Sequence, residues 1–182
     1  MPDPWPLRHL VLRTPRLTLC PDDDEGLYEL AGLALCGVHL PHEMPFLFPW
    51  TDQAPDGLVR GTMQYYWGAR SRLTASDWNV NFLVRYADQV IGAQGLSAKA
   101  FPILGVVSSG SWLGCAHQRQ GFGTEMRAAV LLLAFDHLGA TTARSGRSPT
   151  TPRHYGSAKS WATAPTEATP TPDGGWRLLR SG

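Results

Sequence analysis

The stretch of sequence that decides the fold is GSWLGCAHQRQGFGTEMRAAVLLLAFDHLG, residues 110–139. It opens with a short extended segment, residues 110–114, and continues into a loop with two glycines, residues 118–123. Residues 124–138 contain no Gly or Pro and are rich in Ala, Leu and Met, which predicts a long helix with Gly139 at its C′ position. A strand, a glycine-containing loop and a helix in this order are typical of a phosphate-binding site.

The physical reason lies in the start of the helix. Backbone N–H groups of the first turn have no intrahelical acceptor and point outward at the positive end of the helix dipole, so a pyrophosphate can accept several of them. Gly121 and Gly123 lack Cβ atoms, which allows the backbone to approach an anion closely. Arg119 adds a positive charge to the same loop. The loop is therefore predicted to bind a phosphorylated ligand.

Two common phosphate loops do not fit. A Walker loop ends in Gly-Lys-Ser/Thr, whereas this loop runs Gly-Thr-Glu, and a dinucleotide fingerprint has three glycines on the first βα turn, whereas this loop lies late in the chain. The spacing Gln-x-x-Gly-x-Gly, from Gln118 to Gly123, instead resembles the acyl-CoA pyrophosphate loop of the GNAT superfamily of N-acyltransferases.

Three further features resemble the branch of that family that acetylates ribosomal-protein N-termini. Residues 12–19, Leu-Arg-Thr-Pro-Arg-Leu-Thr-Leu, are similar to its first strand, where Thr-x-Arg-Leu-x-Leu recurs. Val90-Ile91-Gly92 stands where the branch has its Ile-Gly strand, and Trp112-Leu113-Gly114 precedes the loop at the family's spacing. The resemblance covers residues 10–139. It implies an α+β fold of three layers, a mixed and mostly antiparallel sheet flanked by helices.

The resemblance also implies a function: transfer of an acetyl group from acetyl-CoA to a primary amine of a small molecule or a peptide N-terminus, without a covalent enzyme intermediate. The amides of residues 112–114 would pair with the pantetheine arm, and one of them, assigned to Leu113, would polarise the thioester carbonyl. Glu43 is the candidate base, although a solvated structural carboxylate is the alternative. The predicted cofactor-binding residues are Trp112, Leu113, Gly114, Gln118, Arg119, Gln120, Gly121, Phe122, Gly123 and Thr124.

Residues 38–50 have neither helical nor strand periodicity and carry His, Pro and large apolar residues, which indicates an ordered loop lined with aromatics. This loop is expected to border the acceptor site. Met44, Phe46, Trp50 and, from the strand before the loop, Ser109 are the predicted substrate contacts. The alternative is that at least one of the aromatic residues packs in the core.

Elsewhere, Asp22, Asp23 and Asp24 are N-cap candidates for one helix, and residues 56–70 predict a second. Residues 78–85 and 89–96 predict two strands joined as a hairpin, and residues 103–107 a further extended segment.

Composition narrows the class of protein. The net charge is +1 and there is no basic run, so no nucleic-acid partner is expected. The longest apolar run falls far short of the roughly 20 residues that span a bilayer, and no signal peptide is recognisable, so no membrane association is expected. Three widely spaced cysteines predict free thiols in a reducing cytoplasm. His39 and His42 have no third ligand at suitable spacing, so no metal is expected, while a homodimer is compatible with the sequence.

The composition changes after Gly139. Residues 140–182 contain no Val, Ile, Phe or Met, and Leu occurs only at positions 178 and 179. We therefore divide the chain into an acyltransferase part, residues 1–140, and a Pro/Thr/Ala-rich tail, residues 141–182, expected to be poorly ordered. The family's late Asn-x-x-Ser and Lys-Leu-Gly-Phe/Tyr motifs have no counterpart there, so the sheet is expected to be incomplete and activity is in doubt.

A shifted reading frame after Ala143 is one hypothesis for this change. Read two bases later, the codons for residues 147–163 permit a series with Asn, Ser and Lys-Leu-Gly-Tyr in the family's order. The junction of His154 and Tyr155 forces Leu, and that of Trp161 and Ala162 forces Gly.

Three classes of function stay open at this stage. The first is the N-acetyltransferase, with succinyl or another acyl group as a possible alternative donor. The second is a non-catalytic or impaired product of the same fold. The third is an acyl-CoA-binding module that uses the same loop without transferring the acyl group.

Overall fold

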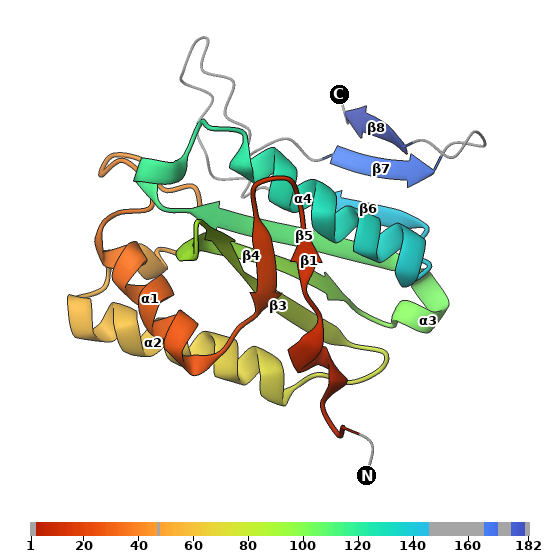
Figure 1. Cartoon of the computed structure of the whole chain (residues 1–182), viewed down its shortest axis with the longest axis horizontal. Helices are drawn as coiled ribbons and strands as arrows, with labels where there is room; N and C mark the ends of the chain where they lie inside the picture. The colour runs from red at the N-terminus through yellow and green to blue at the C-terminus, as the bar shows by residue number, and fades with distance from the viewer. Residues whose placement is uncertain (1–2, 47, 146–165, 171–175, 181–182) are drawn as a thin grey trace.

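The computed structural model describes residues 3–46, 48–145, 166–170 and 176–180. Along the chain the elements are η1 (Pro6–His9), β1 (Leu12–Arg13), β2 (Thr18–Pro21), α1 (Asp24–Leu35), η2 (Trp50–Asp52), α2 (Pro55–Ser71), β3 (Trp78–Tyr86), β4 (Gln89–Ala98), α3 (Phe101–Leu104), β5 (Val106–Leu113), η3 (Cys115–His117), α4 (Phe122–Leu132), the π-helical turn η4 (Leu133–His137), β6 (Thr142–Ser145), β7 (Thr166–Pro170) and β8 (Trp176–Arg180). The strands form one sheet in sequence order, and α4 lies across it (Figure 1).

The sheet is mixed. Every neighbouring pair of strands is antiparallel except β5 and β6, which are parallel and are joined through α4. A hairpin reverses the direction of the chain and so joins antiparallel strands. Two parallel strands need a longer crossover connection, which α4 supplies here. The fold class predicted from the sequence, an α+β three-layer arrangement, is confirmed.

Strand alternation separates the two faces of the sheet. On one face Phe82, Val84 and Leu96 pack with Met126 and Val130 of α4 in one buried cluster. On the other face, Leu83 and Ala93 pack with residues of α1 and α2, namely Leu27, Leu30, Met63 and Tyr66. Both faces are thus covered, which gives three layers.

Local chemistry explains several element boundaries. Asp23 is the N-cap of α1, and its side chain accepts a hydrogen bond from the Gly26 N–H at 2.7 Å, as the Asp cluster predicted. Gly139 has a φ of +73° after the helical residues end, which confirms its C′ position. The extended segment predicted over residues 103–107 is wrong in its first half. Pro102 stands in the first turn of the short helix α3, and β5 begins only at Val106.

Three short segments of the tail are described by the structure, and all three are strands. Thr142–Ser145 form β6, paired with Val106–Ser109, and Ala143 is only 1% exposed. The backbones of β7 and β8 continue the sheet. A strand added to an existing sheet is held by backbone hydrogen bonds and needs little apolar area of its own. The remaining tail residues, 146–165, 171–175 and 181–182, lie outside the described ranges.

A buried carboxyl lies where β2 leads into α1. The Asp22 side chain is 6% exposed and its Oδ2 is 3.4 Å from Arg70 Nε of α2. Burial raises the pKa of Asp22 to about 6, although the Arg70 charge opposes this. The folded protein therefore holds the Asp22 proton over a pH range in which the unfolded chain, with a pKa near 3.8, has released it.

This carboxyl predicts a pH dependence of stability. Because the folded pKa is the higher one, the free energy of unfolding should fall as pH rises from about 4 to about 6, by at most about 3 kcal/mol. Asp22→Asn should remove this slope and raise stability at pH 7, measured by urea denaturation across that range. Parallel pH profiles for the two proteins would show that Asp22 ionises without cost.

Candidate functional site

The loop before α4 has an unusual backbone. Arg119 and Gly121 have φ values of +61° and +84°, so left-handed residues flank Gln120. Gly121 is the N-cap of α4, and within the described part of the chain no side chain caps this helix. The N–H groups of the first turn, from Phe122 to Thr124, therefore have neither an intrahelical acceptor nor a capping side chain. Successive peptide groups turned in this way form a concave surface that suits an anion.

Three side chains of the loop hold its shape. Gln118 Nε2 donates to the carbonyl oxygens of Val38, at 2.7 Å, and of Leu113, at 2.9 Å, which ties the loop to the α1–α2 connection and to the end of β5. Gln120 Nε2 donates to Ala116 O at 2.9 Å. Phe122 is 2% exposed. These side chains are engaged with the protein, so any contribution of theirs to an anion site would come from the backbone.

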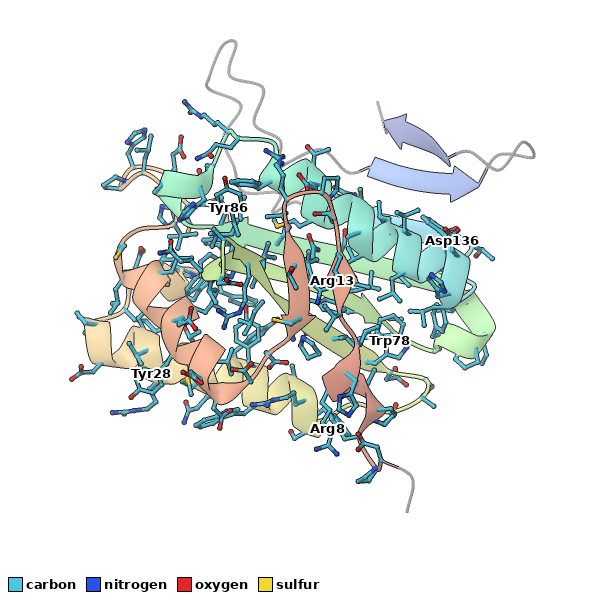
Figure 2. The ribbon with its side chains drawn as sticks, viewed as in Figure 1. Arg8, Arg13, Tyr28, Trp78, Tyr86 and Asp136 are labelled. Carbon is cyan, nitrogen blue, oxygen red and sulfur yellow. The ribbon has the colours of Figure 1, made fainter. Side chains whose placement is uncertain are left out.

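Phe122 is held between two partners. Its ring centroid is 4.8 Å from that of Tyr86, the residue at the end of β3 that is labelled in Figure 2. The Arg16 guanidinium carbon lies 4.6 Å from the same centroid. The first turn of α4 is thus anchored to the β3–β4 hairpin and to the β1–β2 connection.

The edge of β5 opens next to this loop. Among the described residues β6 pairs with β5 only from Val106 to Ser109, so the segment from Gly110 to Leu113 has no strand partner on that side. The Gly114 N–H donates to Ile91 O of β4 at 3.1 Å. Because successive residues of a strand direct their N–H groups to opposite edges, the Leu113 N–H points away from β4, toward the open edge. Of the amides at positions 112–114, that of Leu113 is the one facing the opening.

The aromatic loop predicted to border an acceptor site contacts the same strand. The ring centroids of Phe46 and Trp50 are 5.1 Å apart, and those of Trp50 and Trp112 are 5.4 Å apart. Phe46 and Trp50 are partly buried against a cluster of Ala34, Val38 and Leu58, so both also serve the core. Met44 is half-buried, whereas Glu43 is exposed and its N–H donates to Leu40 O.

Ser109 does not join this group. It is 7% exposed, and the continuous register of β4 and β5 places its side chain on the same face as Val107 and Leu113, which belong to the α4-side cluster. The Trp112 side chain packs on the opposite face, with the α1 and α2 clusters. The structure therefore separates Ser109 from Trp50 and Phe46.

Thr14, Arg16 and Glu125 were not among the predicted site residues, yet all three meet at the loop. Thr14 Oγ1 donates to Glu125 Oε1 at 2.5 Å, and Arg16 Nη2 forms an ion pair with Glu125 Oε2 at 2.6 Å. Burial alone would raise the pKa of Glu125, but the hydrogen bonds from Thr14 and Arg16 outweigh it and lower that pKa below its ordinary value. The Thr-x-Arg motif and the Glu after the glycines were both visible in the sequence, but nothing local connects them.

Two pockets lie elsewhere on the described part of the chain. Both are lined by Trp5, Arg70 and Leu73, and the smaller, of about 180 Å³, also by Asp22 and Asn81. Neither includes a residue of the loop 118–123, so these hollows and the loop are distinct features. In the same part of the chain no three His, Cys, Asp or Glu side chains gather as metal ligands, and no helix is long and apolar enough to cross a membrane.

Comparison with protein families assigns the chain to one of them. The model of the acetyltransferase (GNAT) domain matches residues 10–160. The chain belongs to the GNAT acetyltransferase family. The match extends past Gly139, the last residue of the resemblance predicted from the sequence.

Solved structures agree with this assignment at the level of the fold. The chain is 16% identical to Mycobacterium smegmatis RimJ in complex with CoA-disulfide, with a TM-score of 0.61 over 78% of this chain and 68% of that one. It is 15% identical to RimL, a ribosomal L7/L12 α-N-protein acetyltransferase in complex with coenzyme A, with a TM-score of 0.58 over 75% and 73%. A GCN5-related N-acetyltransferase from Brucella melitensis is 20% identical, with a TM-score of 0.56 over 78% and 61%. The predicted likeness to ribosomal-protein acetyltransferases is thus confirmed in the fold.

Proposed function

We propose that the chain transfers an acetyl group from acetyl-CoA to a primary amine of a small molecule or a peptide N-terminus. The observation that carries the proposal is the placement of two features next to each other. One is the uncapped first turn of α4 behind the left-handed Gly121, and the other is the open edge of β5 at Leu113.

In this proposal the first turn of α4 binds the CoA pyrophosphate through the N–H groups from Gly121 to Thr124. The fit is supported by the missing Cβ at Gly121 and Gly123, because an anion has to approach the backbone closely. Arg119, which is exposed, adds positive charge at the loop surface. The open edge from Gly110 to Leu113 accommodates the pantetheine arm as if it were an additional strand.

The thioester carbonyl would then meet the N–H group of Leu113. A fixed N–H donor stabilises the oxygen as it becomes negative during attack by the amine, and it needs no reorganisation when the reaction occurs. The neutral amine attacks the carbonyl carbon, the thiolate of CoA leaves, and the amine loses its proton to a base or to water. The ring of Trp50, which contacts Trp112, and the ring of Phe46, which contacts Trp50, form the adjoining wall for the acceptor.

The test is release of free CoA thiol from acetyl-CoA with a panel of primary amines, including peptides with free N-termini, alongside a thermal shift with CoA. Thiol release that requires both the protein and an amine supports the enzyme. A thermal shift without thiol release points to an acyl-CoA-binding module, and no shift at all points to a product that keeps the fold without the ligand. Repeating the assay with succinyl-CoA defines the acyl donor.

We expect Glu43 to contribute little. It is exposed on the α1–α2 loop, and loss of a general base typically costs on the order of 10²-fold in rate. Glu43→Gln, which keeps the size and removes the basicity, should reduce the acetyl-transfer rate less than about fivefold at optimal pH. A hundredfold loss, with the KM for acetyl-CoA unchanged, would instead make Glu43 the base.

The shifted-frame hypothesis for the tail is tested by nucleotides rather than by the protein. Residues 147–163, over which the shifted reading is made, lie outside the described ranges. Sequencing the gene past the codon for Ala143 should show, two bases later, codons for the family's Asn, Ser and Lys-Leu-Gly-Tyr in order. A stop codon or an unrelated peptide in that frame would end the hypothesis.

A further inference from the structure

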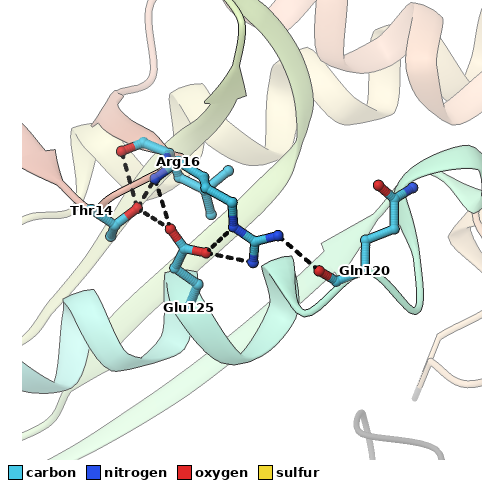
Figure 3. A network of polar contacts seen from close by, with 5 residues as sticks. Thr14, Arg16, Gln120 and Glu125 are labelled. Atoms are coloured by element: carbon cyan, nitrogen blue, oxygen red, sulfur yellow. Dashed lines mark hydrogen bonds and ion pairs between the residues drawn. The ribbon is translucent and has the colours of Figure 1, made fainter.

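Arg16 connects the β1–β2 turn to the loop through three donors (Figure 3). Its Nε donates to Glu125 Oε2 at 2.7 Å and its Nη2 contacts the same oxygen at 2.6 Å. Its Nη1 donates to the carbonyl oxygen of Gln120 at 3.0 Å. One guanidinium thus bridges the Glu125 carboxylate on the first turn of α4 and a carbonyl within the glycine loop.

The Glu125 carboxylate is held from its other side as well. Its Oε1 accepts the Arg16 N–H at 3.0 Å and the Thr14 hydroxyl at 2.5 Å, while Thr14 Oγ1 also accepts the Leu17 N–H at 2.8 Å. The Arg16 side chain is 44% exposed and that of Glu125 only 16%, so the pair lies at the surface end of a part-buried network. These contacts fix where the guanidinium can stand.

The contact to Gln120 O determines the direction of a neighbouring donor. A trans peptide group is planar, and its C=O and N–H point in opposite directions. Because the Gln120 carbonyl is drawn toward Arg16, the N–H of Gly121 in the same peptide group points away from Arg16. That N–H is the first of the donors proposed to bind the pyrophosphate.

Gly121 is the residue that permits this approach. A Cβ built there would lie 3.2 Å from Arg16 Nη2, closer than ordinary contact, and its φ of +84° disfavours other residues. The guanidinium, the glycine and the left-handed N-cap therefore belong to one arrangement.

We propose that Arg16 is a positioning residue for the acyl-CoA pyrophosphate, which orients the Gly121 N–H by holding the Gln120 carbonyl, with Glu125 and Thr14 fixing its guanidinium. The inference rests on the proposed function. It gives the Thr-x-Arg motif a role in ligand binding, although Arg16 itself does not contact the reacting atoms. A lysine cannot replace it, because one ammonium lacks the planar fork that reaches both acceptors.

The test compares two ligands in wild type and Arg16→Lys, with dissociation constants measured by titration. CoA carries the pyrophosphate and S-acetylpantetheine does not. We expect Arg16→Lys to weaken CoA binding more than tenfold and S-acetylpantetheine binding less than threefold. A general loosening of the fold would weaken both ligands alike, and that result would overturn the proposal.

Arg85→Lys is the matched control. Arg85 also bridges a carboxylate, that of Glu29 at 3.0 Å, and a backbone carbonyl, that of Asp88 at 2.8 Å. It pairs with Glu29 of α1, on the face of the sheet opposite α4, and its hydrogen bonds to Glu29 and Asp88 involve none of residues 118–125, so this change should leave the ratio of the two dissociation constants at its wild-type value. An equal change of the ratio in both variants would contradict the inference.

Two further measurements keep the inference testable. In wild type the amide resonance of Gly121 should move downfield on adding CoA, and in Arg16→Lys this shift should be lost. If Arg16→Lys does not fold, Glu125→Gln, which retains an accepting oxygen, should reduce CoA affinity several-fold and spare S-acetylpantetheine. Wild type that does not bind CoA would overturn the proposed function as well, whereas wild-type binding with an unchanged ligand ratio in the variants would overturn the role of Arg16 alone.

Discussion

Gly121→Val should weaken CoA binding by at least about a hundredfold, which corresponds to about 2.7 kcal/mol. The N-cap φ of +84° lies in a region that β-branched residues avoid, and the added Cβ would stand 3.2 Å from Arg16 Nη2. The loop would have to change its backbone, and the N–H donors that an anion needs would turn away. Isothermal titration with CoA measures the loss.

Gly139→Val is a suitable control for the cost of backbone strain. Gly139 has a comparable φ of +73° at the other end of the same helical stretch, and no described residue has an atom within 4 Å of the position a Cβ would take. This variant should lose thermal stability and keep the wild-type affinity for CoA. An unchanged affinity in Gly121→Val would show that the loop does not bind the pyrophosphate.

The helices and strands were predictable where the pattern was local. The Asp cluster predicted the N-cap at Asp23, and the absence of Gly and Pro over residues 124–138 predicted a helical segment. The position of the last helical turn was predicted as well, but not its π-helical form at Leu133–His137. Hydrogen-bond spacing within a helix depends on how it packs, and the sequence pattern does not show it.

The tail shows the limit of composition as a guide. Residues 142–145, Thr-Ala-Arg-Ser, lack the apolar alternation of a strand, yet they form β6 because β5 offers an edge with unpaired backbone groups. Small residues suit this position, where Ala143 packs in the α4-side cluster. The extended structure of residues 142–145 therefore depends on pairing with β5 and not on the pattern of the segment itself.

The position of the loop could be predicted from the sequence, but the side-chain contacts that hold it could not. The glycine spacing located the left-handed turn before α4. Side-chain directions could not be predicted, so Gln118, Gln120 and Phe122 were assigned to the cofactor although their side chains hold the loop. The pairing of Arg16 with Glu125 spans 109 positions of sequence. Such a pair becomes visible only when the fold brings β1–β2 and α4 together.

The close packing of β4 against β5 explains why a glycine follows Ile91 at position 92. The register with β3 shifts between Val84 and Arg85, which leaves Ile91 as an extra residue before Gly92, and Gly92 then lies opposite Leu113 of β5. A Cβ at Gly92 would be 2.2 Å from the Trp112 carbonyl oxygen and 2.9 Å from Leu113 Cα. Both are backbone atoms of the strand whose open edge faces the loop, so neither can move aside by a change of rotamer.

Gly92→Ala should therefore destabilise the protein by about 3 kcal/mol, at the upper end of what overpacking costs, as measured by urea denaturation. Gly110→Ala is the control in the neighbouring strand β5. Among the described residues no atom lies within 4 Å of its Cβ position, so this change should cost little stability. Any Gly92→Ala protein that remains folded should also lose acetyl transfer more than CoA affinity, because the strain displaces the Leu113 N–H and leaves the α4 turn in place. Equal stabilities for the two variants would mean that β4 and β5 are not packed as closely as the 2.2 Å contact requires.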